Sequence, residues 1–266
     1  MINPDRYPLT QDQIDSYQAN RCLRLKNVLS TAEIQRYGQE ISRLLVDLNT
    51  MHLPMAERDT YSRAFLQVMN LWTRSDATKE LVFSQRLAQI AAELMDVDGV
   101  RLYHDQGLYK EPGGGHTPWH ADQYYWPLST DRTVTAWIPL QSTPLEMGPL
   151  EFASRSHQLE GGRSLGISDE SEVAIDQMLA NGGFEHVVAP FDLGDVSFHS
   201  GWLYHRAGPN VTDMPRGVMT IIYMDADMVL QNPENDNQRL DWETWCPGAR
   251  VGEIIDTPLN PLLFRK

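Results

Sequence analysis

Two short segments that lie far apart in the sequence carry the side chains of a potential metal site, and the fold must bring them together. His120 and Asp122 stand one residue apart, and His205 follows Asp122 by 83 positions (205 − 122). Side chains two positions apart on an extended strand leave the same face. Two imidazoles and one carboxylate are the ligand set of mononuclear non-haem iron, with positions left open for other ligands. The sequence therefore predicts an iron(II) site where the two segments meet.

An arginine that could bind a carboxylate follows the second segment. Arg216 lies eleven positions after His205 (216 − 205) and begins an apolar run that ends at Tyr223. A guanidinium offers a rigid fork of donors that binds a carboxylate bidentately. A His-x-Asp pair alone is a weak signal, because polar residues alternate by chance in most chains. The order of all four parts makes a binding site for iron and a dicarboxylate the stronger hypothesis.

The secondary-structure signals run from helices to short strands. Capping boxes at Thr10 and Ser30 predict a helix to about Asn20 and a longer one through Leu48, and Ser84 is expected to cap a third. Apolar runs bounded by Gly, Pro, Asp or Asn predict strands at 100–104, 107–110, 133–140, 150–152, 186–188, 196–198 and 217–224. This order favours a mainly β fold with flanking helices and a double-stranded β-helix (jelly-roll, cupin-like) core.

The length suits one domain with one core. We expect a helical part at about 1–98, a β core at about 99–228 and a docked tail at about 229–266, irregular and held by Trp242 and Trp245. Residues 51–62 are expected to form a loop, and residues 160–183 a loop with one short helical piece. Both segments are candidate lids.

Charge and composition exclude several classes of protein. The formal net charge of −14, without a visible basic patch, disfavours nucleic acid as a partner. No window approaches the roughly 18 apolar residues of a membrane span. Residues 1–6 lack the layout of a signal peptide, and Cys22 and Cys246 are the two cysteines. We expect a cytoplasmic protein with free thiols.

Longer motifs surround these residues, at 9–17, 108–115, 117–128, 134–140, 146–157 and 194–199, and His205 begins His-Arg-Ala-Gly-Pro-Asn. Together they resemble the phytanoyl-CoA dioxygenase family of Fe(II)/2-oxoglutarate oxygenases over most of the chain. Two departures stand out. Glu146-Met147 replaces an Asn before Gly-Pro, and Ala207 stands where relatives often carry a hydroxyl residue that touches the co-substrate.

The resemblance implies roles for individual residues. His120, Asp122 and His205 would hold Fe(II), which also takes 2-oxoglutarate and O₂, and Arg216 would pair with the distal carboxylate of 2-oxoglutarate. Gln106 and Trp137 lie where relatives contact the co-substrate, although a core amide and a core tryptophan explain them nearly as well. Further expectations concern residues beside the site, where substrate contact competes with solvation or packing: Lys110, Tyr124, Tyr125, Trp126 and Arg206.

The predicted function is that of a dioxygenase which hydroxylates an unactivated carbon of a small polar or natural-product-like molecule and releases succinate and CO₂. Desaturation and cyclisation stay open. The alternatives are a non-catalytic, metal-binding cupin-like module and an oxygenase of an acyl-CoA thioester, which the lack of a basic cluster disfavours. Asp122 argues against halogenation, because halogenating relatives lack that carboxylate. Of the remaining histidines, His199 is expected to pack beside the site without binding the metal.

Overall fold

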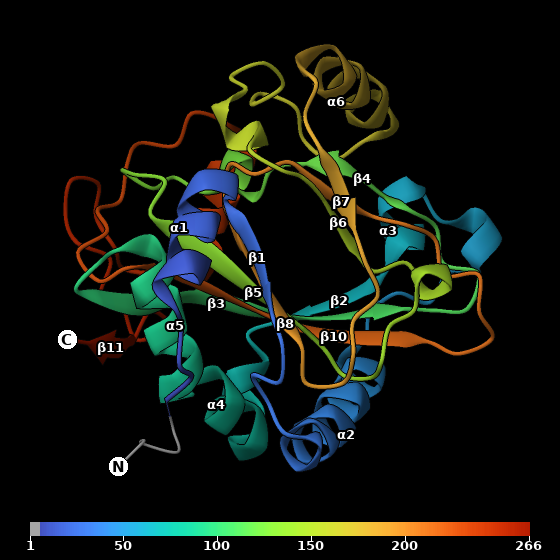
Figure 1. Cartoon of the computed structure of the whole chain (residues 1–266), viewed down its shortest axis with the longest axis horizontal. Helices are drawn as coiled ribbons and strands as arrows, with labels where there is room; N and C mark the ends of the chain where they lie inside the picture. Colours follow the sequence, from blue (N-terminus) through green and yellow to red (C-terminus); the bar gives the residue numbers. More distant parts are fainter. Residues whose placement is uncertain (1–5) are drawn as a thin grey trace.

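Two antiparallel sheets form the centre of the protein in the computed structural model, which describes residues 6–266 (Figure 1). The larger sheet has the order β1-β8-β5-β10-β3-β11, with β2 paired to β3, and the smaller sheet has the order β4-β9-β6-β7. The strands of the larger sheet are β1 Cys22–Leu25, β2 Leu66–Met69, β3 Gly99–Lys110, β5 Thr133–Pro139, β8 Val196–Ser200, β10 Arg216–Asp225 and β11 Leu262–Arg265. Those of the smaller sheet are β4 Thr117–His120, β6 Leu150–Ala153, β7 His186–Val188 and β9 His205–Ala207.

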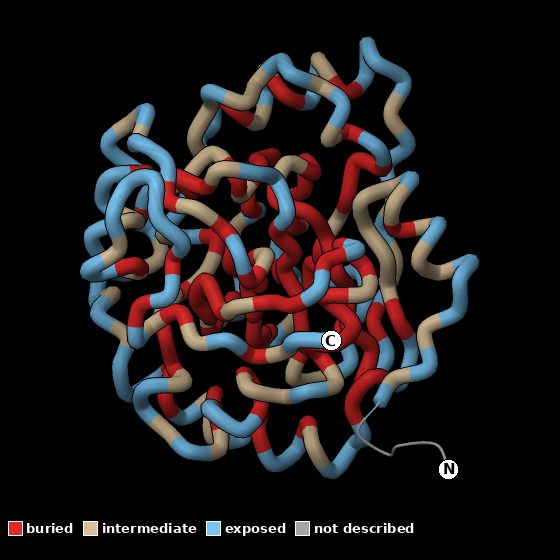
Figure 2. Tube along the Cα trace, turned by 90° about the vertical axis from the view of Figure 1, so that its left-hand side faces the viewer, coloured by how far each residue is buried: buried red, intermediate tan, exposed pale blue. Residues whose placement is uncertain are grey.

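Helices surround the sheets (Figure 1). The buried segments lie mainly in the interior of the molecule (Figure 2). The α-helices are α1 Gln11–Asn20, α2 Thr31–Leu48, α3 Thr60–Ala64, α4 Asp76–Val82, α5 Gln85–Met95, α6 Asp169–Gly182 and α7 Asp236–Trp245. Short 3-10 helices are η1 Met55–Glu57, η2 Leu71–Thr73, η3 Asp122–Tyr125, η4 Leu145–Met147 and η5 Ser156–Gln158. Residues 1–6 were expected to lack the layout of a signal peptide. Residues 1–5 of this stretch lie outside the part of the chain that the structure describes.

Strand alternation gives the larger sheet two different faces. Along β5, Ala136 and Ile138 belong to the main hydrophobic core, together with Ile41 of α2 and Ile90 of α5. Their neighbour Trp137 points to the other side and lines a cavity. The helices thus cover one face of the sheet, and the other face is left for a binding site.

The helix starts expected from the sequence are confirmed. Thr10 and Ser30 each accept a hydrogen bond from the backbone N–H three residues later, and the side chains of Gln13 and Glu33 return the contact. Ser84 likewise accepts from the backbone N–H of Leu87 at the start of α5. These pairs satisfy N–H groups that a helix otherwise leaves without partners.

The two strands expected at 100–104 and 107–110 are one strand, β3. Asp105, which suggested a break, is fully buried, and its carboxylate accepts hydrogen bonds from the backbone N–H groups of Leu71 (2.8 Å) and Trp72 (3.2 Å). The acidic residue therefore ties η2 to the sheet and does not interrupt the strand. β2, which pairs with β3, and α4 were not anticipated.

The tail was wrongly expected to be irregular. It contains α7, whose first N–H groups are capped by Asn235, and β11, which adds an edge strand to β3. The segment 160–183 is mostly α6, which packs through Ile175 and Leu179 against Trp119. Residues 51–62 hold η1 and the start of α3.

Cys22 and Cys246 are free thiols, as expected. Within residues 6–266, none of the helices combines the length and apolar composition that crossing a membrane requires.

Candidate active site

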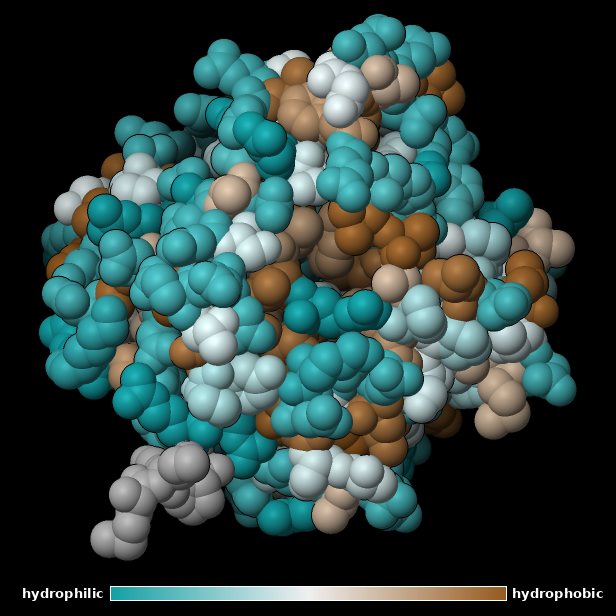
Figure 3. Space-filling view, in the orientation of Figure 1, coloured by the Kyte–Doolittle hydropathy of each residue, from teal (hydrophilic) through white to brown (hydrophobic). Residues whose placement is uncertain are grey.

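A cavity of about 690 Å³ lies between the sheets, and the surface is hollowed near the centre of the face in Figure 3, with hydrophobic side chains on the walls. Both sheets, α3 and α7 contribute to it. Its lining comprises Tyr61, Phe65, Gln67, Met69, His104, Gln106, Leu108, Thr117, His120, Asp122, Tyr125, Trp126, Thr135, Trp137, Leu150, Ile167, His199, His205, Arg206, Ala207, Arg216, Thr220, Asn237, Leu240, Asp241, Thr244 and Trp245.

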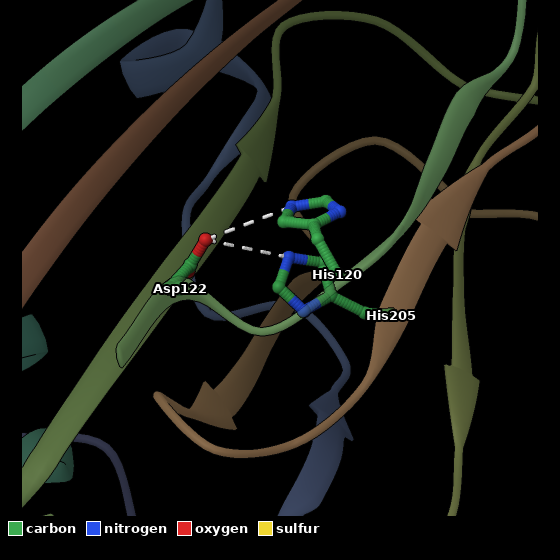
Figure 4. Close-up of side chains that lie close together, drawn as sticks. All are labelled: His120, Asp122 and His205. Atoms are coloured by element: carbon green, nitrogen blue, oxygen red, sulfur yellow. Dashed lines mark ion pairs between the residues drawn. The ribbon is translucent and has the colours of Figure 1, made fainter. Parts of the chain in front are cut away.

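The three predicted metal ligands meet in this cavity (Figure 4). His120 ends β4 and His205 begins β9, and the two residues face each other in the strand register, with ring centroids 4.1 Å apart. Asp122 begins η3, with one residue between it and the end of β4. Its Oδ1 lies 3.7 Å from Nε2 of His120 and 3.6 Å from Nε2 of His205. One donor atom from each side chain lies within 4.8 Å of the others, so a single ion fits among them.

Backbone carbonyl groups orient both imidazoles. Nδ1 of His120 lies 2.7 Å from the oxygen of Pro118, and Nδ1 of His205 lies 3.0 Å from the oxygen of Leu203. A proton on Nδ1 that is donated to the carbonyl leaves the lone pair of Nε2 free on the side of Asp122. Burial lowers the pKa of His120, and burial together with the neighbouring His120 lowers that of His205. These shifts favour the neutral form of each ring, which is the form that binds metal.

Asp122 supplies the negative charge. Burial opposes its ionisation, but His205, His199 and His120 outweigh that effect and lower the pKa of the carboxyl group. Its second oxygen, Oδ2, lies 3.3 Å from the Thr135 hydroxyl and 3.5 Å from Nε2 of His199. Two neutral nitrogens and one anionic oxygen fit Fe(II).

Arg216 is a buried cation in the same cavity, only 1% exposed. One of its terminal nitrogens donates to the carbonyl of Gly148, and its guanidinium lies over the ring of Trp137, 5.5 Å from the centroid. Its Nε has no hydrogen-bond partner, and no acidic side chain of residues 6–266 forms an ion pair with it. Burial lowers its pKa to about 9. An anion is the ligand that would compensate this buried charge.

Gln106 and Trp137 line the cavity, and their contact with a co-substrate stays a prediction. The side-chain oxygen of Gln106 accepts a hydrogen bond from Gln67 at 2.9 Å, so one end of this amide is already held. Trp137 is buried between Arg216 and Phe191.

The five residues predicted to touch substrate separate into two groups. Tyr125, Trp126 and Arg206 line the cavity, whereas Lys110 and Tyr124 do not. Lys110 is fully buried and donates to the carbonyl of Gly115, and burial together with Arg216 lowers its pKa to about 6. The Tyr124 hydroxyl accepts from Asn237 at 3.3 Å. Because neither side chain lines the cavity, the geometry gives no support to their predicted contact with substrate.

Several cavity residues were not anticipated from the sequence. They come from α3 and the residue that follows it, from α7 and from the middle of β3, and they include Tyr61, Phe65, His104, Leu240 and Asp241. The first two and the last two lie in or beside segments expected to be irregular, which gave no periodic pattern to follow. Trp245 was recognised as a docking aromatic, and it also lines the cavity.

Comparison with known proteins agrees with these motifs. The family model "Phytanoyl-CoA dioxygenase (PhyH)" matches residues 17–218. The ectoine dioxygenase of Bordetella parapertussis is 22% identical over 85% of this chain and 79% of the relative. The methylphosphonate hydroxylase of Gimesia maris is 25% identical over 81% and 80%. The epimerase SnoN from nogalamycin biosynthesis, solved with Fe³⁺, alpha ketoglutarate and nogalamycin RO, has a TM-score of 0.80 and 25% identity, covering 96% of this chain and 98% of SnoN.

Proposed function

Because the chain belongs to the phytanoyl-CoA dioxygenase family and is a 2-oxoglutarate-dependent dioxygenase, we propose that it hydroxylates an unactivated carbon of a small polar or natural-product-like molecule. One observation carries this proposal. The buried Arg216, which has no acidic partner within residues 6–266, shares a cavity with the donor atoms of His120, Asp122 and His205. A protein that only bound metal would need no anchor for a second carboxylate.

The residues present fit the cofactor. His120, Asp122 and His205 would hold Fe(II), and Arg216 would hold the distal carboxylate of 2-oxoglutarate. Bound iron supplies the activation of O₂, coupled to the conversion of 2-oxoglutarate to succinate and CO₂.

The protein's own contribution is positioning and exclusion of water. Pro118 and Leu203 fix the two imidazole rings through their carbonyl groups, and His199 and Thr135 contact the second oxygen of Asp122. At the other end of the site, the Gly148 carbonyl and the Trp137 ring hold the guanidinium in place. Side chains held in this way would bind ligands with little reorganisation.

The strand order supports a double-stranded β-helix. In chain order from β3 to β10, the strands alternate between the larger and the smaller sheet, with the single exception of the adjacent pair β6 and β7. Two sheets of four such strands form a jelly roll, and β1, β2 and β11 extend the larger sheet. In this arrangement His120 and His205 come from neighbouring strands of the smaller sheet, and Arg216 comes from the larger one.

The proposal can be tested in two stages. Anaerobic addition of 2-oxoglutarate to the Fe(II) protein should give the weak visible absorption of a chelated oxoacid, and His205→Ala should abolish it. A panel of small molecules is then screened under O₂ for coupled succinate release, in the presence of chloride. Products that gain one oxygen support hydroxylation, whereas a chlorinated product would contradict the role of Asp122. No spectral change with 2-oxoglutarate would favour a metal-binding module without turnover.

A further inference from the structure

The cavity contains a second carboxylate in addition to Asp122, and several aromatic side chains line the same cavity. Asp241 of α7 lines it, and so do five aromatic side chains from different parts of the chain. These are Tyr61, Phe65, Tyr125, Trp126 and Trp245. Asp241 is separate from the candidate metal ligands and needs its own explanation.

A β-bulge in β3 contributes to the cavity wall. The register pairs Ile222 with His104 and Tyr223 with Leu102, so Tyr103 is an extra residue without a partner in β10. A bulge can turn two successive side chains toward one side of a sheet. The rings of Tyr103 and His104 lie 4.9 Å apart, and both lie beside the ring of Trp126.

The two side chains at the bulge have different contacts. The hydroxyl of Tyr103 donates to Oδ2 of Asp241, which holds the carboxylate in the cavity wall. His104 lines the cavity and is 2% exposed, and its Nδ1 has no hydrogen-bond partner within the described chain. Burial lowers the pKa of His104 to about 3, so the ring is neutral and one of its nitrogens can accept a proton donor.

The charges in the cavity leave Asp241 without a cation. Arg206 is already paired with Glu151 at 2.9 Å and with Glu172 at 2.8 Å. Arg216 is the proposed partner of 2-oxoglutarate. No Lys or Arg of residues 6–266 forms an ion pair with Asp241. Burial raises the pKa of Asp241 to about 7, against hydrogen bonds from Tyr103 and Trp245 that lower it, so a ligand cation would favour its ionised form.

We propose that the substrate carries a positively charged nitrogen, as an amine, amidine or guanidine, which binds to Asp241 among the aromatic side chains. This inference rests on the proposed function and narrows it to cationic or zwitterionic substrates. A carboxylate and the faces of aromatic rings both attract a cation, and they do so more strongly in a desolvated cavity. A highly anionic substrate such as an acyl-CoA thioester meets no free basic side chain at this end of the cavity.

Benzylamine, charged at neutral pH, and benzyl alcohol, its neutral analogue, are suitable probes. Their binding is measured by calorimetry on the anaerobic Fe(II) protein saturated with 2-oxoglutarate, and repeated on the metal-free protein. Wild type should bind benzylamine at least tenfold more tightly than benzyl alcohol. Asp241→Asn keeps an oxygen that accepts from Tyr103, so it should remove this preference and leave binding of the alcohol within about twofold.

The matched control is Glu243→Gln, which removes the same charge from an exposed position of α7 that does not line the cavity. It should keep the full preference for benzylamine, since a long-range effect of net charge would appear in both variants. Equal binding of the two probes to wild type, failure of benzylamine to bind, or a preference that survives in Asp241→Asn would each overturn the proposal. Because no turnover is needed, these results stay separate from a failure of the 2-oxoglutarate spectral test.

Discussion

Nε2 of His199 lies 3.5 Å from Oδ2 of Asp122, whereas the other oxygen of this carboxylate, Oδ1, is the one nearest His120 and His205. His199 is 1% exposed, and its ring centroid lies 4.4 Å from that of His205. Neither of its ring nitrogens has a hydrogen-bond partner of good geometry among residues 6–266. His199 therefore packs against the carboxylate, and we propose that it orients this side chain, with His120, Asp122 and His205 as the proposed metal ligands.

Replacing His199 should weaken iron binding while the three ligands stay intact. Loss of a group that orients a metal ligand typically lowers metal affinity by about 10–100-fold. We expect His199→Phe, which lacks a donor, to show a loss of this size in anaerobic Fe(II) titrations. His199→Gln keeps an N–H donor and should retain more of the affinity. Equal affinities for the two variants would mean that His199 only fills space.

Arg216→Met should separate stability from co-substrate binding. Removal of a buried, unpaired charge should raise the free energy of unfolding of the ligand-free protein by about 1 kcal/mol. Loss of the anchor should cost about 2–5 kcal/mol of 2-oxoglutarate binding, which corresponds to roughly 30-fold or more in the concentration required. Urea unfolding and the anaerobic spectral titration measure the two effects.

Arg101→Met is the control for this variant. Arg101 also lies on the larger sheet and donates to backbone carbonyl groups of Ala226 and Asn260, but it does not line the cavity. Its replacement should leave the 2-oxoglutarate requirement unchanged. A similar increase in both variants would show that the effect of Arg216 is indirect.

Gly148→Ala should disturb Arg216 indirectly, through the backbone carbonyl group that accepts a hydrogen bond from its guanidinium. Gly148 has φ of +67°, and a Cβ there would overlap the carbonyl oxygen of Gly208, while the Gly148 carbonyl accepts from Arg216. We expect destabilisation of about 1–3 kcal/mol or more, together with a raised 2-oxoglutarate requirement. Gly183→Ala has nearly the same φ, +66°, but open space around it, so it should lose stability without affecting 2-oxoglutarate. Identical effects of the two changes would remove the steric explanation.

Local signals predicted the parts of the fold and the site that depend on neighbouring residues. Capping boxes marked the starts of α1 and α2, and His-x-Asp followed by a distant His gave three side chains that lie together. The register of β4 and β9 places His205 opposite His120, as the predicted metal site requires. Cytoplasmic residence stays a prediction.

The parts that escaped prediction depend on contacts between distant segments. Asp241 lines the cavity and accepts a hydrogen bond from Tyr103, 138 positions earlier, which stands in a bulge that no local pattern marks. β11 is stabilised by pairing with β3, and a tail rich in Asn and Pro gives little sign of it. Lys110 shows the opposite case: its motif was recognised, but its side chain is held by Gly115 outside the cavity lining.

Lys110→Met should change how stability depends on pH. Burial, and then the nearby Arg216, lower the pKa of Lys110 from 10.5 to about 6, so the unfolded chain binds a proton between these values that the folded chain does not. This group therefore makes wild type less stable as the pH falls from 10.5 toward 6, by up to about 1.4 kcal/mol per pH unit. Urea unfolding of wild type at pH 7 and pH 9.5 should show the higher stability at pH 9.5, and Lys110→Met should lose most of that difference. Lys79→Met, at an exposed position of α4, should keep it. A difference that persists in Lys110→Met would mean that Lys110 is not the source of this pH dependence.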